Sequence, residues 1–393
     1  MPNRPAPNVR KPDVAIIGAG VIGLAIAWRL AAQGASVQVV DRGAAGAGAS
    51  HAAAGMLAAC AEAEPGEEAL VALGRESQAR WPAFAAELLK ASGIDVDLRG
   101  EGTLVVALTA DDQARLSHQL VFQQKLGLPL QWISAAETRR REPHLAGKLA
   151  GAVFSPEDTQ VDNRKLAAAL RLAAEAAGAR VSEHRAVSTL SSRGRRVDGI
   201  VLADGTKVAA DVVVLAAGAW SRSIAGLGPE LLPPVRPIKG QMLALRMDPA
   251  APLLNHVVWA PAAYLVPRRD GRLLVGATVE EKGYDTSLTA GGMLTLLEAA
   301  WRAVPRSRSC QSMRCGWAID RAAATMRRSS APGPSTGSST PPVTIATEFC
   351  LRRSLPTPSH TSCSTASPRP RFVPSASSAL GRFPPRRNKE KPQ

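Results

Sequence analysis

The sequence predicts an α/β fold in two parts: a Rossmann-like dinucleotide-binding domain and an α+β substrate domain with an antiparallel sheet. Residues 13–42 read as an apolar strand, a glycine turn, a helix and a second apolar strand. From Pro233 the pattern changes to apolar strands, two of them joined by an Asp270-Gly271 turn. After Pro305 the apolar period ends and Ser, Pro and Arg dominate, so we expect disorder there.

The 393 residues are enough for two domains, each with its own core. Each domain is expected to combine two stretches of the chain. The expected segments are a flexible N-terminal tail at 1–12, a dinucleotide-binding domain at 13–90 and 150–235, a substrate domain at 91–149 and 236–305, and a Ser/Pro/Arg-rich tail at 306–393.

The net charge of +15 is concentrated in the tail. Residues 306–393 carry 15 Lys and Arg against three acidic residues, a net charge of +12, which leaves +3 for residues 1–305. The part of the chain that is expected to fold is therefore nearly neutral, and we predict no nucleic-acid partner. The N-terminus lacks the apolar core of a secretory signal and no apolar run reaches membrane-spanning length, so we expect a cytoplasmic protein with no membrane partner.

Cysteine usage gives no metal signal. Cys60 is the only cysteine before Pro305, and the four in the tail lack CxxC spacing. We therefore predict no metal site.

The glycine turn predicts a pyrophosphate site. Gly18 allows the tight turn, Gly20 lets the backbone approach a phosphate, and Gly23 lets the helix pack closely on the strand. The helix begins near Val21 and Ile22, where N–H groups and a partial positive charge would face the phosphates.

Asp41 ends the second strand, where it can accept hydrogen bonds from an adenosine ribose, and we place Arg42 in the same site. The residues that follow are small and glycine-rich. Among them ASHAAAGML, residues 49–57, resembles the segment that runs beside the flavin in glycine oxidases of the D-amino-acid oxidase family. The resemblance implies FAD as the cofactor. The cofactor-binding residues that it implies in this segment are Ala49, Ser50, Ala54, Gly55 and Met56.

Two later positions agree with this resemblance. The family usually places a residue at the position of Val187 against the adenine. Gly218 follows the apolar run DVVVLAAG and would end that strand close to the cofactor, as in many FAD proteins; a simple strand-end turn is the alternative. A hairpin through Asp204-Gly205 precedes this run.

Tyr264, in AYLVPR, matches the tyrosine that the family places near the substrate. Its phenol could hydrogen-bond a substrate carboxylate or amine; the alternative is a strand tyrosine with a hydrated hydroxyl. The resemblance implies hydride transfer from the substrate Cα to the flavin, followed by reoxidation by O2 to give H2O2, so no catalytic acid or base is assigned.

The implied partners are a small amino acid and O2, with a possible homo-oligomer and a link to thiamine biosynthesis. The alternatives are a sarcosine oxidase, a D-amino acid dehydrogenase that passes electrons to a quinone, or a non-enzymatic remnant with a basic tail.

The tail lacks two segments of the family, GxRP and GHxRNGILLAP, which carry the arginines expected at the substrate and flavin. Reading the codons one base earlier, with plausible GC-rich third bases, converts residues 341–358 into ATGHHRNGILLAPVTADA and restores a GxRP arginine within residues 306–334. We therefore interpret residues 306–393 as an out-of-frame translation caused by one missing base near the codon for Pro305. A native basic, disordered tail that binds nucleic acid or an acidic partner is the alternative.

Overall fold

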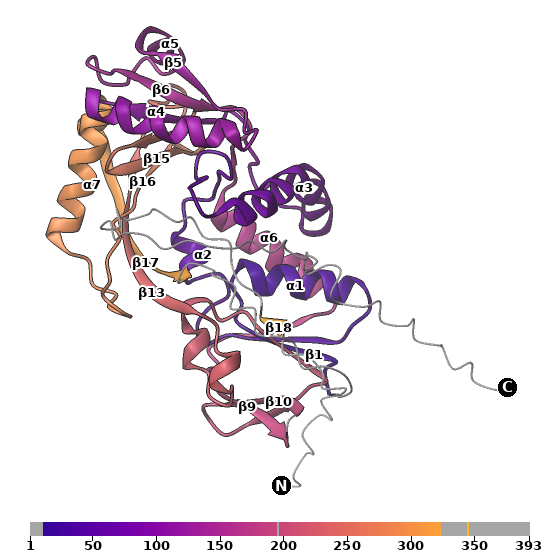
Figure 1. The fold of residues 1–393 in the computed structure, drawn as a ribbon. Coiled ribbons are helices and arrows are strands. Elements are labelled where there is room, and N and C mark those ends of the chain that lie inside the picture. The colour runs from indigo at the N-terminus through magenta and orange to yellow at the C-terminus, as the bar shows by residue number, and fades with distance from the viewer. Residues whose placement is uncertain (1–10, 195, 324–343, 346–393) are drawn as a thin grey trace.

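The dinucleotide-binding half is built on a parallel sheet of five strands (Figure 1). The computed structural model describes residues 11–194, 196–323 and 344–345. In spatial order the strands are β18 (Thr344–Ile345), β12 (Val212–Leu215), β1 (Val14–Ile17), β2 (Val37–Val40) and β8 (Arg180–Ser182). The predicted strand–helix–strand unit is confirmed, because β1 and β2 pair in parallel on either side of α1 (Val21–Ala32) in the sequence.

Alternate residues of β1 face two different layers. Ile16 packs in the cluster formed with α1 and α6 (Asn163–Ala176), together with Leu88 of α3 (Glu68–Ser92). Ile17 packs in a second cluster with the three-stranded antiparallel sheet β9 (Val187–Arg193), β10 (Arg196–Leu202) and β11 (Lys207–Ala209). Figure 1 shows this small sheet below β1 and the helices above it. The parallel sheet is therefore covered on both faces, which explains its uninterrupted apolar strands.

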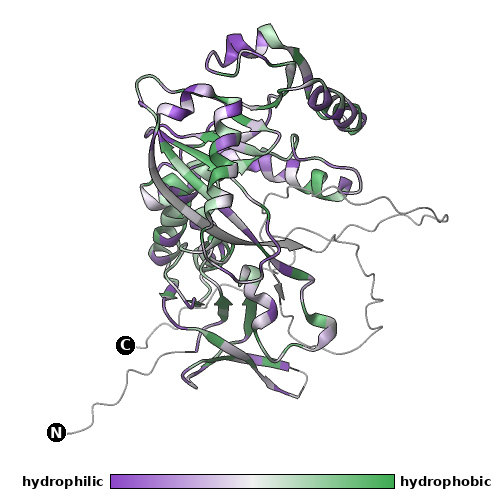
Figure 2. Cartoon of the chain, turned by 90° about the vertical axis from the view of Figure 1, so that its left-hand side faces the viewer, coloured by the Kyte–Doolittle hydropathy of each residue, from purple (hydrophilic) through white to green (hydrophobic). Residues whose placement is uncertain are grey.

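The second half is an eight-stranded sheet whose neighbouring strands are antiparallel except for the pair β4–β14. In spatial order its strands are β17 (Gln311–Ala323), β13 (Val235–Arg246), β16 (Arg272–Gly276), β15 (Ala263–Pro267), β14 (Val257–Ala260), β4 (Thr103–Ala107), β6 (Gly151–Ser155) and β5 (Gln131–Ser134). Val106 packs with α7 (Ala290–Ala303), whereas the adjacent Ala107 packs with α4 (Ala110–Lys125). The two helices therefore cover opposite faces, and Figure 2 shows mostly hydrophobic strands between them.

The remaining elements are short. They are α2 (Ala49–Ala52), β3 (Met56–Leu57), α5 (Ala135–Arg141), β7 (Thr159–Gln160) and the 3-10 turns at Gly218–Ser223, Pro229–Leu231 and Pro305–Ser309. Both predicted hairpins are confirmed, with Asp204-Gly205 between β10 and β11 and Asp270-Gly271 between β15 and β16.

Two expected boundaries are wrong. β6 lies in the eight-stranded sheet, although residues 150–235 were expected in the dinucleotide-binding domain; its five buried residues pair with β4 and β5. The predicted tail also does not start at 306, because residues 311–323 form β17 along the whole of β13. The sequence of β17 has apolar residues at every second position from Met313 to Ile319, which is a strand pattern that the Ser, Pro and Arg content of the tail obscured. Residues 324–343 and 346–393 of the expected tail, and residues 1–10, lie outside the described residues.

Among the residues that the structure describes, no helix is long and apolar enough to cross a membrane.

Candidate functional site

The turn after β1 has no room for a side chain at two of its three glycines. Gly18 has a φ of +107°, and a Cβ on it would lie 2.4 Å from the carbonyl oxygen of Ala216. A Cβ on Gly23 would lie 1.9 Å from the carbonyl oxygen of Gly18. These contacts bring β1, the first turn of α1 and the end of β12 together, which is the packing expected of the first and third glycines.

Gly20 differs, because it borders a more open space. It is the N-terminal cap of α1, and the nearest atom to a Cβ on it would be Ser50 Oγ at 3.2 Å. Ser50 Oγ accepts the N–H of Val21 at 3.1 Å. The first turn of α1, with Val21 and Ile22, thus opens toward segment 49–56, and its positive dipole end faces the space where the predicted pyrophosphate would lie.

Asp41 lies beside the turn and is held by two backbone groups. One carboxylate oxygen accepts the N–H of Ala19 at 2.7 Å and the other accepts the N–H of Gly43 at 2.8 Å. Each oxygen has a second lone pair, so the carboxylate can still accept a ribose hydroxyl. The two bonds fix its orientation toward the glycine turn.

Val187 and Gly218 both lie near the carboxyl ends of the parallel strands. Val187 is half-buried at the start of β9, in the cluster that contains Ile17 and Val40. Gly218 has a φ of +54° and starts the 3-10 turn after β12. Ligands of open α/β sheets bind at this edge, and the prediction assigns both residues to the cofactor site.

Arg42 lies at the outer rim of this edge. Its guanidinium carbon is 3.8 Å from the centre of the Trp220 ring, in the turn that begins at Gly218. Trp220 in turn stacks on Tyr284, with ring centres 5.7 Å apart. The Tyr284 hydroxyl donates to the Ala219 carbonyl at 3.0 Å. The loop between β16 and α7 therefore closes over the adenosine end of the predicted site.

Segment 49–56 runs from α2 to β3. Ala49 and Ser50 lie in α2, close to the glycine turn, and Met56 begins β3, which pairs with β7. Gly55 has a φ of +65°, and its carbonyl accepts the N–H of Val161 at 2.9 Å. The segment therefore spans from the predicted phosphate position to the eight-stranded sheet.

Tyr264, in β15, packs where this segment meets the sheet. It borders a cluster that includes Ala54 and Met56. Its hydroxyl donates to Met242 Sδ at 3.7 Å. A Cβ on Gly276 would lie 2.7 Å from the Tyr264 ring, so the glycine lets the ring lie flat against β16. The structure thus brings the predicted substrate residue next to the predicted flavin segment.

Sequence reasoning missed three residues at this junction. Trp259 faces Tyr264 across the β14–β15 pair, and its indole N–H donates to Met56 Sδ at 3.2 Å. Met242 carries the sulfur that accepts from Tyr264. Arg268, only 4% exposed, donates to the Ala54 carbonyl at 2.5 Å. Strand periodicity marks Trp259 and Met242 as core residues only, and an arginine in a hairpin turn is normally exposed.

A buried carboxyl holds the loop that follows β3. Asp158 accepts the N–H groups of Cys60 and Ala61, each at 3.1 Å, on different oxygens. Burial raises its pKa to about 6, against the favourable hydrogen bonds that it accepts. Burial, followed by the charge of Asp158, also raises the pKa of Glu62 well above its usual value. The hydrogen bonds that hold this loop therefore depend on the protonation state of Asp158.

We expect Asp158→Asn to reveal this response. Because the folded-state pKa of Asp158 is raised, its contribution to stability is complete below about pH 4 and is lost as the pH rises through about 6. The free energy of unfolding of the wild type, relative to Asp158→Asn, should therefore rise by about 2–3 kcal/mol between pH 7 and pH 4. Urea unfolding at several pH values measures this difference. Asp111→Asn, on an exposed face of α4, is the control; an equal trend in both variants would contradict the assignment.

The described residues fit a bound FAD. Gly20 borders an open space at a helix N-terminus, Asp41 is oriented beside it, and segment 49–56 extends from there to Tyr264. This order matches an extended ligand with a phosphate centre, a ribose and a planar ring. In the described part of the chain, no group of three or more His, Cys, Asp or Glu residues is arranged to hold a metal ion.

Comparison with known proteins gives a consistent result. The sequence pattern of the family described as FAD dependent oxidoreductase matches residues 13–350. A glycine oxidase of Geobacillus kaustophilus is 40% identical over 296 residues, which are 75% of this chain and 77% of the relative. The crystal structure of glycine oxidase from that organism superposes with a TM-score of 0.72 at 37% identity, covering 80% of this chain and 83% of the other.

Two further similar proteins have other names. A bifunctional protein ThiO/ThiG of Synechocystis sp. is 38% identical over 300 residues, which are 75% of this chain but 42% of that longer protein. The crystal structure of iminodiacetate oxidase from Chelativorans sp. has a TM-score of 0.71 at 29% identity and covers 80% of this chain and 85% of that one.

Proposed function

Because the chain belongs to the family of FAD-dependent oxidoreductases, we propose that it is an amino-acid oxidase that binds FAD along residues 18–23 and segment 49–56. The observation that carries this proposal is the continuity of segment 49–56. Its start contacts the helix N-terminus through Ser50, and its end packs beside Tyr264. A cofactor laid along it would therefore present its phosphates to α1 and its ring to the eight-stranded sheet.

We assign the ends of the cofactor by the groups that border each position. Asp41 would accept from the ribose, with Arg42 and Val187 on the adenine side. Ala54, Gly55 and Met56 would border the flavin, and Gly218 would lie close to the cofactor where β12 ends. When bound, FAD supplies the acceptor for a hydride from the substrate Cα, and its reoxidation by O2 yields H2O2.

The chain's own residues orient the substrate and exclude water. The Tyr264 hydroxyl donates to the thioether sulfur of Met242, which is a weak acceptor that a substrate carboxylate can replace. Trp259 and Met242 surround the tyrosine with apolar surface. Such a wall limits access of water to the carbon that loses its hydride.

We propose glycine or a small amino acid as the substrate, by analogy with the glycine oxidase relative, and a role in thiamine biosynthesis by analogy with the ThiO/ThiG relative. The likeness to an iminodiacetate oxidase supports a secondary amine, such as sarcosine, as the second candidate. We further propose a cytoplasmic protein that assembles as a homo-oligomer.

A substrate carboxylate also needs a fixed cation. If residues 306–393 are translated out of frame, the arginine that would supply this cation is missing from the chain. The GxRP arginine that the shifted reading restores falls at position 320, where this chain has Asp320. Position 320 pairs with Ile238 in the β17–β13 ladder. We therefore propose that the literal chain carries an acidic residue where the family uses an arginine, and that its activity is impaired.

The test is reconstitution of the purified full chain. We expect FAD titration to give a bound-flavin absorption spectrum, and glycine, sarcosine, iminodiacetate or D-alanine to reduce that flavin slowly without oxygen. Peroxide release in air distinguishes an oxidase from a dehydrogenase. A protein that is folded by circular dichroism but binds no FAD would overturn the cofactor assignment. Bound flavin that no amine reduces would overturn the substrate assignment alone.

A further inference from the structure

Buried side chains from two other elements hold the peptide carbonyls of segment 49–56. The Asn163 amide, at the first residue of α6, donates to the carbonyls of Ser50 at 2.8 Å and His51 at 2.9 Å. Arg268 Nη2, from the turn between β15 and β16, donates to the carbonyl of Ala54 at 2.5 Å. The three carbonyls are thus held from opposite sides of the junction between the two sheets.

Arg268 also orients Asn163. Its Nη2 lies 3.4 Å from Asn163 Oδ1, and its Nη1 donates to Gln160 Oε1 at 3.0 Å. Asn163 is 4% exposed and Gln160 2% exposed, so these bonds are shielded from water. One guanidinium therefore contacts segment 49–56 directly and also the side chain that holds the start of that segment.

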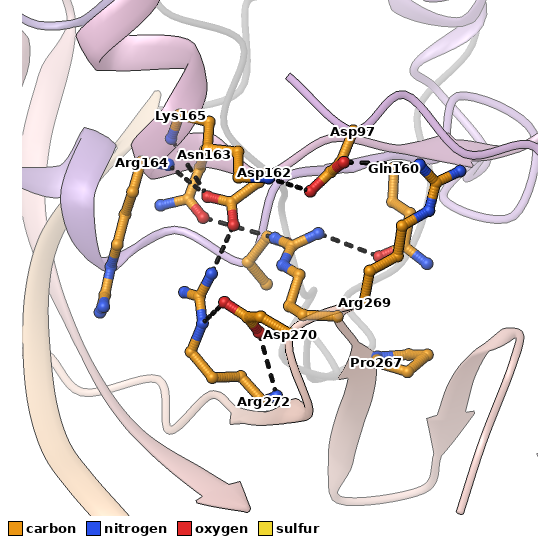
Figure 3. A network of polar contacts seen from close by, with 12 residues as sticks. Asp97, Gln160, Asp162, Asn163, Arg164, Lys165, Pro267, Arg269, Asp270 and Arg272 are labelled. Atoms are coloured by element: carbon orange, nitrogen blue, oxygen red, sulfur yellow. Dashed lines mark hydrogen bonds and ion pairs between the residues drawn. The ribbon is translucent and has the colours of Figure 1, made fainter. Parts of the chain in front are cut away.

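The surrounding charges keep Arg268 in place. Figure 3 shows Asp162 and Asn163, at the start of α6, facing the turn that carries Arg269, Asp270 and Arg272. Arg272 Nη2 donates to Asp162 Oδ2 at 2.5 Å. Burial of Asp162 favours its protonated form and acts to raise its pKa. The positive charge of Arg268, together with the other groups around the carboxylate, outweighs this effect, so the pKa of Asp162 lies below its usual value.

Arg268 itself remains a cation at neutral pH. Burial lowers its pKa to about 10, and the charge of Asp162 opposes this effect. A charged guanidinium donates stronger hydrogen bonds than a neutral group does.

Gly55 shows how closely Arg268 approaches the backbone. A Cβ on Gly55 would lie 2.2 Å from the Val161 carbonyl oxygen and 2.9 Å from Arg268 Nη2. Any other residue at position 55 would therefore displace the guanidinium, and the φ of +65° also favours glycine.

We propose that Arg268 is a positioning residue, through which the β15–β16 turn of the substrate domain fixes segment 49–56 in the shape that receives the flavin. Arg268 connects the eight-stranded sheet to the segment, whereas Asn163 belongs to the dinucleotide-binding half. Arg268 can therefore position the segment relative to the substrate domain, which Asn163 cannot. The inference rests on the proposed FAD site, but the hydrogen bonds that define it are present in the protein without the cofactor.

The experiment compares Arg268→Met and Arg268→Lys with Arg269→Met in the full chain. Arg269 occupies the same turn, is exposed and contacts Asp97 at 3.5 Å, so it is a matched control. Amide hydrogen exchange of residues 49–57 is followed without FAD, and the FAD dissociation constant is measured by flavin fluorescence. We expect Arg268→Met to speed exchange in the segment and to raise the dissociation constant about tenfold or more, because the Ala54 carbonyl loses a buried charged donor.

Arg268→Lys keeps the charge but cannot bond two acceptors in the same geometry, so we expect an intermediate effect. Arg269→Met should match the wild type in both measurements. Unchanged exchange in both Arg268 variants, or wild-type FAD affinity in a folded Arg268→Met protein, would overturn the proposal. If the wild type binds no FAD, the proposed function fails, but the exchange measurement still decides whether Arg268 orders the segment. If Arg268→Met does not fold, Arg268→Lys supplies both measurements.

Discussion

Inserting one base near the codon for Pro305, so that the downstream region is translated in the other frame, is expected to raise glycine-dependent H2O2 formation by about a hundredfold or more. The physical reason is the carboxylate of the substrate. The shifted frame replaces Asp320 by an arginine in the strand that pairs with β13. Under the proposed function, an acidic residue at this position would repel the substrate carboxylate, whereas an arginine would bind it bidentately and orient its Cα.

Asp320→Arg in the literal chain is the matched control. It restores the charge at one position but not the GHHRNGILLAP segment, so we expect a smaller gain in activity than the frame correction gives. Initial rates of peroxide release on glycine, measured on proteins of equal flavin content, compare the three. If sequencing shows no missing base and the literal chain oxidises glycine as fast as the frame-corrected chain, the out-of-frame interpretation is wrong.

Gly18→Ala is expected to abolish FAD retention and to reduce the free energy of unfolding by about 3 kcal/mol or more. A methyl group at this position would lie 2.4 Å from the Ala216 carbonyl oxygen, and the backbone also has a φ of +107°. Neither β1 nor β12 can move away without breaking their parallel ladder, in which all four residues of each strand pair.

The variant Gly34→Ala tests the effect of backbone strain without the steric clash that a side chain at Gly18 causes. Gly34 has a φ of +89°, but no atom lies within 4 Å of a Cβ built on it. We expect this variant to lose about 1 kcal/mol of stability and to keep its affinity for FAD. Chemical unfolding and FAD titration measure both quantities; equal losses in the two variants would show that collision at the turn is not the dominant effect.

Local signals in the sequence were sufficient for the first half of the fold. Residues 13–42 contain the whole of the β1–α1–β2 unit, and its hydrophobic period, its glycines and Asp41 are close together in the chain. The two Asp-Gly hairpins were predicted for the same reason, because a two-residue turn determines which strands pair.

β17 carries a local strand signal that the prediction overlooked. Its residues, QSMRCGWAIDRAA, place apolar side chains at every second position from Met313 to Ile319. The Ser, Pro and Arg content after Pro305 was given more weight than this alternation, and the pairing of the strand along β13 is seen only in the structure. The start of the predicted tail was therefore placed too early.

The sequence by itself determined the dinucleotide turn and the resemblance to FAD-dependent oxidases. Only the tertiary structure decided that Arg268 is buried and holds Ala54, a residue 214 positions away in the chain. An arginine beside an Asp-Gly turn is normally hydrated, and no residue near Arg268 in the sequence indicates that its side chain is buried. Burial of such a charge depends on which distant acceptors the fold assembles around it, and that arrangement exists only once the two sheets have packed together.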